Sequence, residues 1–232
     1  MSLDVRGEII KLARELAVEP GDLAFLEGAD RDDVRRLRVA LEDALDQRNR
    51  GIYRRIEASS RLLPPGVAVK IATASFPPLI IGRVSEEIPS DRSPKFLEHM
   101  PIEKTGEILP HMNPRRMSDT VRALPVSQMA PMIKELERRE EFVTMGRFLA
   151  VLTDEQIPAV LAEIEDGRTL LLAGFHTEDP ERLDAFVKVM TDEQLVSIRD
   201  AASDQGLDDE LAVVLANLPP ATRARAEAAG MG

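Results

Sequence analysis

Residues 89–125 read PSDRSPKFLEHMPIEKTGEILPHMNPRRMSDTVRALP, and the spacing of prolines in this stretch decides the fold. Proline has no backbone N–H and fixes φ, so it opens or ends helices and is rare inside them. Four prolines divide this stretch into three segments that are just long enough for short helices. Each segment has apolar residues near its C-terminal end. The prolines are Pro89, Pro101, Pro114 and Pro125, and the closing residues are Phe96, Leu97 and Met100, then Ile108, Leu109 and Met112, then Val121 and Leu124. This pattern predicts a repeat of short helices.

Helix signals continue on both sides of this stretch. Pro64, Pro65 and Gly66 mark a boundary and open a predicted helix that ends at Pro77. Further helices are predicted at 79–88 and 126–139, then at 157–165, 168–175, 180–190, 195–202, 208–218 and 223–229. No segment has the sustained alternation or the hairpin turns of a β-strand pair. The predicted class is therefore all-α.

A second internal repeat follows, with a displacement of 38 residues. Residues 148–157 read FLAVLTDEQI and residues 186–195 read FVKVMTDEQL. In each copy Thr and the Gln three residues later form the pattern of a capping box, and the Asp-Glu pair falls where the helix dipole favours negative charge. A 38-residue period lies in the range of two-helix solenoid units, so we expect a superhelical, solenoid-like repeat domain over residues 64–232.

Residues 1–63 are predicted to form an N-terminal helical arm. A short amphipathic helix is expected at 3–18, and Asp30 has the features of an N-cap for a long helix up to residue 63, with Gly51 as a break or kink. An apolar stripe follows this helix at helical spacing, and it is the predicted interaction surface of the arm, packed within the chain or between chains. The stripe consists of Val34, Leu37, Leu41, Leu45, Ile52 and Ile56.

Arginines cluster on the same helix, but acidic residues are interleaved with them. Mixed charge beside an apolar stripe is typical of a solvated, coiled-coil-like helix, and it favours a dimerising or docking arm over nucleic-acid binding. The arginines are Arg35, Arg36, Arg38, Arg48, Arg50, Arg54 and Arg55.

Composition excludes several classes of protein. The chain has 232 residues and no Cys, which rules out disulfides and thiolate sites. Its apolar runs are too short for a signal peptide or a membrane span, so a cytoplasmic protein without membrane insertion is expected. The net charge is -11, and the last third, residues 151–232, holds 6 Lys and Arg against 17 Asp and Glu. That acidic third would attract cations or a basic partner and repel nucleic acid.

No catalytic motif is present: the chain lacks GxSxG, P-loop, GxGxxG and HExxH patterns. Metal binding is the chemistry left open, because His99 and His111 occupy parallel places in consecutive pieces, and carboxylate pairs can hold Mg²⁺. Positions near helix ends and helix caps explain the same residues without a metal. The carboxylate candidates are Asp154, Glu155, Asp192 and Glu193.

Methionines are frequent in the repeat region. They fill cores between short helices, but they also line grooves that accept varied apolar partners or a greasy ligand. These residues are Met100, Met112, Met117, Met129, Met132 and Met145.

The phrase LEHMPIEKTGEILPHMNPRRMSDTVRALP, with its short helices cut by prolines, resembles the superhelical N-terminal intracellular domain of MgtE-type magnesium transporters. The similarity covers roughly residues 76–200. It implies an acidic, cation-responsive regulatory module, and it assigns no metal ligand because no functional motif matches residue by residue.

These observations predict a non-catalytic, helical-repeat protein that acts in protein–protein interaction or regulation, without a cofactor, and that binds a protein partner or forms a homodimer. One alternative is a regulatory module that responds to Mg²⁺ through its acidic C-terminal third. Another is an enzyme or a carrier of an apolar ligand.

Overall fold

The computed structural model describes residues 3–231, and within that range the chain is all-α, with no β-strand. The all-α prediction is therefore confirmed. The elements are α1 (Leu3–Leu16), η1 (Pro20–Leu26), α2 (Arg31–Ser60), α3 (Pro65–Ser75), α4 (Pro78–Ser85), α5 (Ser93–Leu97), α6 (Ile102–Ile108), η2 (Leu109–His111), α7 (Ser118–Ala123), α8 (Val126–Arg138), α9 (Phe142–Leu149), α10 (Ile157–Leu161), α11 (Gly167–Phe175), α12 (Pro180–Val189), α13 (Asp192–Gln205), α14 (Asp208–Ala216), α15 (Pro220–Ala226) and η3 (Glu227–Met231).

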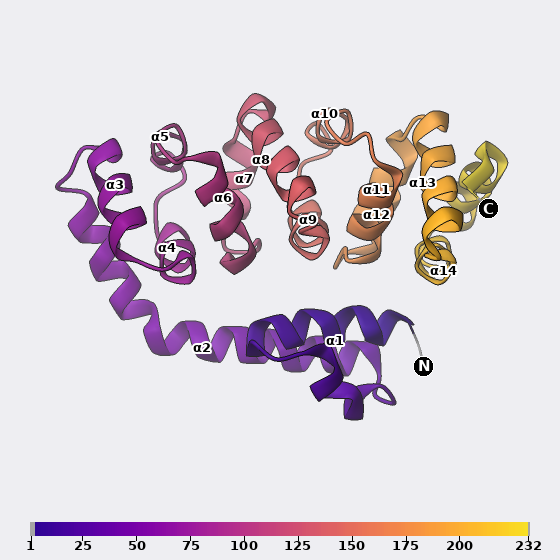
Figure 1. The fold of residues 1–232 in the computed structure, drawn as a ribbon, viewed down its shortest axis with the longest axis horizontal. Coiled ribbons are helices and arrows are strands. Elements are labelled where there is room, and N and C mark those ends of the chain that lie inside the picture. Colours follow the sequence, from indigo (N-terminus) through magenta and orange to yellow (C-terminus); the bar gives the residue numbers. More distant parts are fainter. Residues whose placement is uncertain (1–2, 232) are drawn as a thin grey trace.

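The helices from α3 onwards stand side by side in chain order and form a long row (Figure 1). Neighbours in the row pack on one another: α11, for example, contacts α9, α13 and α14. One large apolar core runs through the row, from Ile81 in α4 to Met231 at its far end. The helices therefore follow one another along the row in the same order as the predicted helical segments in the sequence.

Prolines stand at most of the predicted helix boundaries, although Pro78 belongs to α4 and Pro131 lies inside α8. Pro65 and Pro78 open α3 and α4, and Pro101 and Pro125 stand immediately before α6 and α8. The pieces between the prolines at 89, 101, 114 and 125 contain α5, then α6 with η2, then α7. Fixed φ and the missing N–H suit proline to these positions.

The two copies of the 38-residue repeat form the same local hydrogen bonds. The N–H of Gln194 donates to the Thr191 hydroxyl over 3.2 Å, and Gln194 accepts from the Thr191 N–H over 3.1 Å, which completes the predicted capping box of α13. Thr153 and Gln156 form the same pair of hydrogen bonds. They enclose a turn, and α10 begins one residue later.

Helices α1 and α2 lie side by side under the row, and η1 returns the chain between them (Figure 1). The Asp30 side chain accepts hydrogen bonds from the N–H groups of Asp32 and Asp33, so the predicted N-cap is confirmed. α2 passes through Gly51 as one continuous helix, so the chain does not break there, and Figure 1 shows that the helix bends along its length. It ends at Ser60 and α3 begins at Pro65, so the predicted boundary between residues 63 and 64 falls in their connection.

The apolar stripe of α2 packs within the chain at some positions and is exposed at others. Ile56 is half-buried and lines a cavity between α2, α3 and α4. Val34 is buried in a small core with α1 and η1, and Leu41 packs beside it, but Leu37, Leu45 and Ile52 are exposed. The side of α2 that faces the protein carries charged residues and Tyr53 instead. The reason is that the row presents arginines and a glutamate to α2, and charged residues of α2 pair with them.

No helix in the described part of the chain has the length and apolar character needed to cross a bilayer.

Candidate functional site

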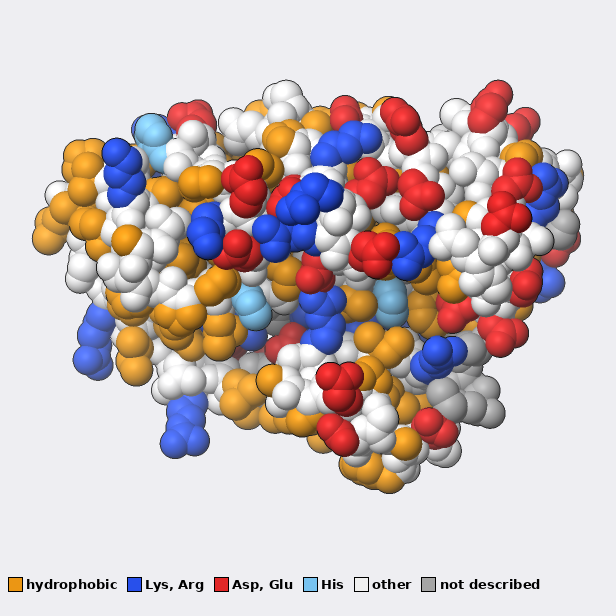
Figure 2. Space-filling model, in the orientation of Figure 1, with side chains coloured by type: hydrophobic (Ala, Val, Ile, Leu, Met, Phe, Trp, Pro, Cys, Tyr) orange, Lys and Arg blue, Asp and Glu red, His pale blue; other side chains and the backbone are white. Residues whose placement is uncertain are grey.

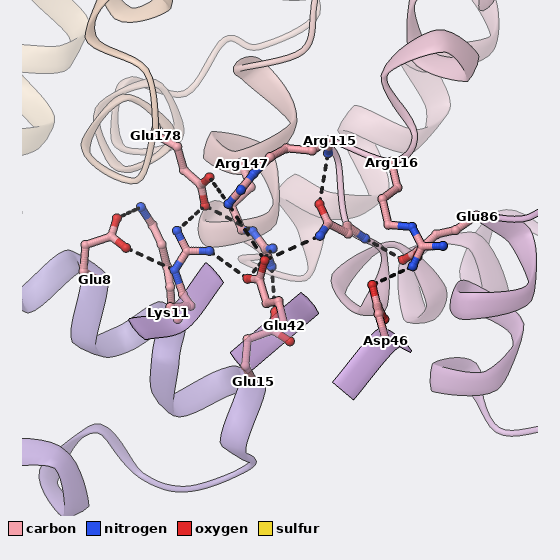
Figure 3. Close-up of polar contacts among 12 residues, drawn as sticks. Glu8, Lys11, Glu15, Glu42, Asp46, Glu86, Arg115, Arg116, Arg147 and Glu178 are labelled. Atoms are coloured by element: carbon pink, nitrogen blue, oxygen red, sulfur yellow. Dashed lines mark hydrogen bonds and ion pairs between the residues drawn. The ribbon is translucent and has the colours of Figure 1, made fainter. Parts of the chain in front are cut away.

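A layer of paired charges lies between the α1–α2 pair and the row of helices, and we call it the charged layer (Figure 3). It contains equal numbers of acidic and basic side chains, most of them buried. From α1 to the loop before α12 they are Glu8, Lys11, Glu15, Arg38, Glu42, Asp46, Arg83, Glu86, Arg115, Arg116, Arg147 and Glu178.

Arg38 of α2 is the centre of one half of the charged layer. Its side chain is 0% exposed, and its guanidinium contacts three carboxylates: Nε lies 3.1 Å from Glu8, Nη1 lies 2.7 Å from Glu42, and Nη2 lies 2.8 Å from Glu178. Burial opposes the charge, but the three carboxylates outweigh it and raise the pKa of Arg38. Arg38 thus joins α1, α2 and the loop before α12.

Glu8 and Lys11 extend this half along α1. The Lys11 Nζ donates to Glu8 over 2.8 Å, and both side chains are 3% exposed. Burial alone would raise the pKa of Glu8, but Lys11 and Arg38 together lower it to about 2. Glu8 is therefore a carboxylate that the fold keeps ionised.

Glu86, at the end of α4, is the centre of the other half. Its Oε1 accepts the backbone N–H of Asn113 over 2.8 Å and lies 3.2 Å from Arg83, and its Oε2 lies 3.1 Å from Arg116. Burial is the largest influence and raises the pKa of Glu86 to about 7, against the opposing effects of the N–H and the two arginines. Arg116 also pairs with Asp46 of α2 over 2.6 Å, which ties this half to the long helix.

Arg147 of α9 connects the layer to the middle of the row. Its Nη1 donates to Glu15 of α1 and its Nη2 donates to Glu42 of α2, both over 3.0 Å. Charged hydrogen bonds that join two helices to a third fix their relative position, since displacing any one leaves a buried charge unpaired. Figure 2 shows the hollow between the row and the α1–α2 pair, with charged side chains of both signs inside it.

The paired charges of the charged layer have a structural role: they hold α1 and α2 against the row of helices. The layer's acids and bases are equal in number and are paired with one another, so their mutual attraction is used in holding helices together. His176 lies beside the layer and is buried, and burial first, then Lys11 and Arg14, lower its pKa to about 3. A neutral imidazole next to these cations adds no further positive charge.

The predicted metal candidates lie apart from one another. His99 is exposed beside Gly66 of α3, whereas His111 is exposed beside Gly82 of α4. Asp154 pairs with Arg182 over 2.6 Å, and Asp192 lies 3.5 Å from Arg225. Glu155 and Glu193 are exposed. Among the residues that the structure describes, no three His, Asp or Glu side chains are grouped so as to hold a metal ion.

The predicted methionines do come together. All six line one apolar cavity inside the row, with the residues that close the proline-cut pieces.

The charged layer was not predicted from the sequence. Arg38, Glu42 and Asp46 are each four residues apart and follow Val34, so they share one face of α2. That spacing indicates a charged face on the same side as the buried Val34. The interleaved charges of the whole helix, in contrast, are typical of a solvated surface and hide this signal.

No family model, curated protein or solved structure matches this chain. The resemblance to the N-terminal domain of MgtE-type transporters therefore stays a prediction from the sequence.

Proposed function

We propose that this protein is a non-catalytic interaction module that self-associates through the exposed face of α2. The surface in question, which we call the α2 ridge, consists of Leu37, Leu45 and Ile52. Their side chains are 52%, 44% and 54% exposed. Large apolar residues gathered on one face of a helix mark a contact surface more often than residues scattered singly.

The charged layer supports this proposal because it fixes the face of α2 next to the ridge: around the helix axis Glu42 lies about 60° and Asp46 about 100° from Leu45. Arg38, Glu42 and Asp46 hold α2 against the row, so the α2 ridge faces outward on a helix that cannot rotate without breaking buried ion pairs. A surface that is already rigid loses little entropy on binding.

A second copy of the chain is the partner that fits the ridge best. Leu37 lies eight residues before Leu45, and Ile52 lies seven residues after it. The apolar residues of the ridge are therefore spaced almost symmetrically about Leu45. Two antiparallel α2 helices would place Leu45 of one copy beside Leu45 of the other, with Leu37 beside Ile52 at each end. Such a surface is self-complementary, as a two-fold interface requires.

Sedimentation velocity tests the proposal on three proteins. We expect the wild-type chain to form dimers in a concentration-dependent way, and Leu45→Glu to stay monomeric at the same concentrations, because two like charges would meet at the two-fold axis. Leu62→Glu is the matched control, since Leu62 is 86% exposed and lies outside the ridge. A monomeric wild type at about 100 µM, well above the Kd range of specific dimers, would make the self-association proposal wrong.

The Mg²⁺-responsive alternative has no comparable support among the described residues, because its candidate ligands are dispersed or paired with arginines.

A further inference from the structure

The apolar residues that close the proline-cut pieces converge on one cavity. It has a volume of about 150 Å³ and lies inside the row between α5 and α11; we call it the methionine cavity. A cavity of that size lined by aliphatic and aromatic side chains stays dry and can bind a small apolar molecule. Its lining includes Phe96, Leu97, Met100, Ile108, Leu109, Met112, Val121 and Leu124.

Methionine gives this cavity an adaptable wall. The thioether side chain is unbranched and has three rotatable bonds, so it reshapes to fit an apolar guest at low cost. Six methionines from α6–α9 and the connections around them contribute. They are Met100, Met112, Met117, Met129, Met132 and Met145.

A second cavity continues the first towards the surface. It has a volume of about 300 Å³ and lies between the end of α2, α3 and α4, and we call it the α3 cavity. Four residues line both cavities, so the two cavities adjoin and share one wall. The shared residues are Ser85, Ile88, Phe96 and Met100. Together the volumes fall in the range of sites for small ligands.

Neither cavity has an ionisable side chain in its lining. Several of the lining hydroxyls are used within their own helices: Ser93 donates to the Pro89 carbonyl, and Thr105 donates to the Pro101 carbonyl. At the outer end, Ser59 and Ser60 likewise donate to backbone carbonyls of α2. A ligand with many polar groups would lose its hydrogen bonds with water in these cavities, and the lining would offer few new ones in their place. Sugars and nucleotides are therefore excluded as ligands.

Exposed apolar side chains surround the outer end of the α3 cavity. Figure 2 shows orange side chains gathered at the end of the row that carries α3. A patch of this kind is where a poorly soluble molecule would be transferred from its source without passing through water. The residues are Leu62, Leu63, Val67, Ile71, Phe76 and Leu79.

We propose that the methionine cavity and the α3 cavity bind one unbranched hydrocarbon chain, supplied by a free fatty acid or by a single-chain lipid. The apolar lining of both cavities, without an ionisable side chain, fits such a chain. An amphipathic helix does not fit, because a helix about 10–12 Å across with its side chains needs more room than cavities of about 150 Å³ and 300 Å³ provide. The polar head of the ligand would lie at the outer end, near Ser59 and Ser60, where Leu63 and Ile71 are accessible to solvent.

Isothermal titration with hexadecanoic acid tests the proposal below the micelle concentration. We expect saturable binding of one molecule per chain. Octanoic acid should bind more weakly, by about two- to fourfold for each methylene that it lacks, because each buried methylene contributes about 0.8 kcal/mol. A second titration, with lysophosphatidylcholine that carries a sixteen-carbon chain, shows which kind of molecule supplies the hydrocarbon chain. Binding of both ligands assigns recognition to the chain alone, whereas binding of the acid alone assigns the site to free fatty acids.

The variant Ser85→Leu tests whether the ligand binds in these two cavities. Ser85 lines both cavities where they meet, so a leucine there would fill their junction and weaken the binding of hexadecanoic acid by about tenfold or more. Ser127→Leu is the matched control, because Ser127 is exposed on α8 and lines neither cavity. Circular dichroism verifies that both variants are folded. If Ser85→Leu does not fold, Thr120→Leu provides a second block at the inner cavity.

Two results would overturn the proposal. One is the absence of saturable binding for both hexadecanoic acid and lysophosphatidylcholine. The other is binding that folded Ser85→Leu and Thr120→Leu leave at the wild-type affinity, since the chain would then occupy a different place.

Discussion

Gly167 shows how one absent side chain sets the distance between two helices. It opens α11, and a Cβ built on it would lie 2.1 Å from the carbonyl oxygen of Ser197 in α13. The neighbour is backbone, so no rotamer change relieves the clash. In the sequence Gly167 lies between the helices predicted at 157–165 and 168–175, but the close approach depends on a helix thirty residues later.

We therefore predict that Gly167→Ala destabilises the protein by about 2–3 kcal/mol, the cost of forcing packed helices apart. Gly51→Ala is the control, because no atom lies within 4 Å of a Cβ at that position in the exposed part of α2. We expect that change to stabilise by about 0.5–1 kcal/mol, the helix-propensity difference between the two residues. Urea unfolding measures both. Equal stability of the two variants would contradict the close packing of α11 on α13.

At the scale of helices, features that depend on neighbours in sequence were predictable and features that depend on distant partners were not. The Asp30 cap, the Thr191 capping box and the proline boundaries involve residues within four positions of one another. The charged layer joins Glu15 to Arg147 across 132 positions. The spacing of apolar residues predicts the stripe of α2, but its environment depends on what the row presents to the neighbouring face of the helix.

The 38-residue repeat is an intermediate case. In addition to its cap, Gln194 donates to the carbonyl of Leu161 over 3.0 Å, and Gln156 donates to that of Val121 over 3.0 Å. Each glutamine thus joins its own turn to the end of a helix more than thirty residues earlier. The repeated letters predicted the caps, whereas the second contact requires the three-dimensional arrangement.

We predict that Arg38→Met costs about 3–5 kcal/mol of stability, because it leaves Glu8, Glu42 and Glu178 without their common partner in a buried site. The control is Arg36→Met on the exposed side of the same helix, where an ion pair to Asp33 contributes about 0–1 kcal/mol. Thermal or urea unfolding gives the comparison. A loss for Arg38→Met no larger than that for Arg36→Met would mean that the charged layer does not hold α2 in place.

At the scale of the whole molecule, the charged layer makes stability depend on pH. Folding raises the pKa of Glu86 to about 7 from an ordinary value of 4.5, so the folded protein binds a proton more tightly than the unfolded chain. Its contribution to stability is fully present below about pH 4.5 and is lost as the pH rises to about 7. The lowered pKa values of Glu8 and His176 act in the opposite direction, so their contributions are lost on acidification.

Glu86→Gln isolates one of these contributions. We predict that the stability of this variant relative to wild type rises between pH 5 and pH 7, by about 1.4 kcal/mol for each pH unit at most, because glutamine does not ionise. Urea unfolding at pH 5, 6 and 7 measures the difference. Glu155→Gln, which changes an exposed carboxylate, is the control and should follow the wild type. A constant difference for Glu86→Gln would show that Glu86 is ionised throughout this range.

The long separation between α1 and its ion-pair partners also has a consequence during synthesis. Arg14 pairs with Glu141, and Glu15 pairs with Arg147, so these two partners are translated more than 120 residues after α1. At ribosomal rates of about 5–20 residues per second, that delay is on the order of ten seconds. Until then Arg14 and Glu15 lack these two partners, so we expect the docking of the α1–α2 pair onto the row to be completed late in folding. Nascent chains arrested before residue 141 should therefore be cleaved by protease in the first sixty residues, and released full-length chains should resist that cleavage.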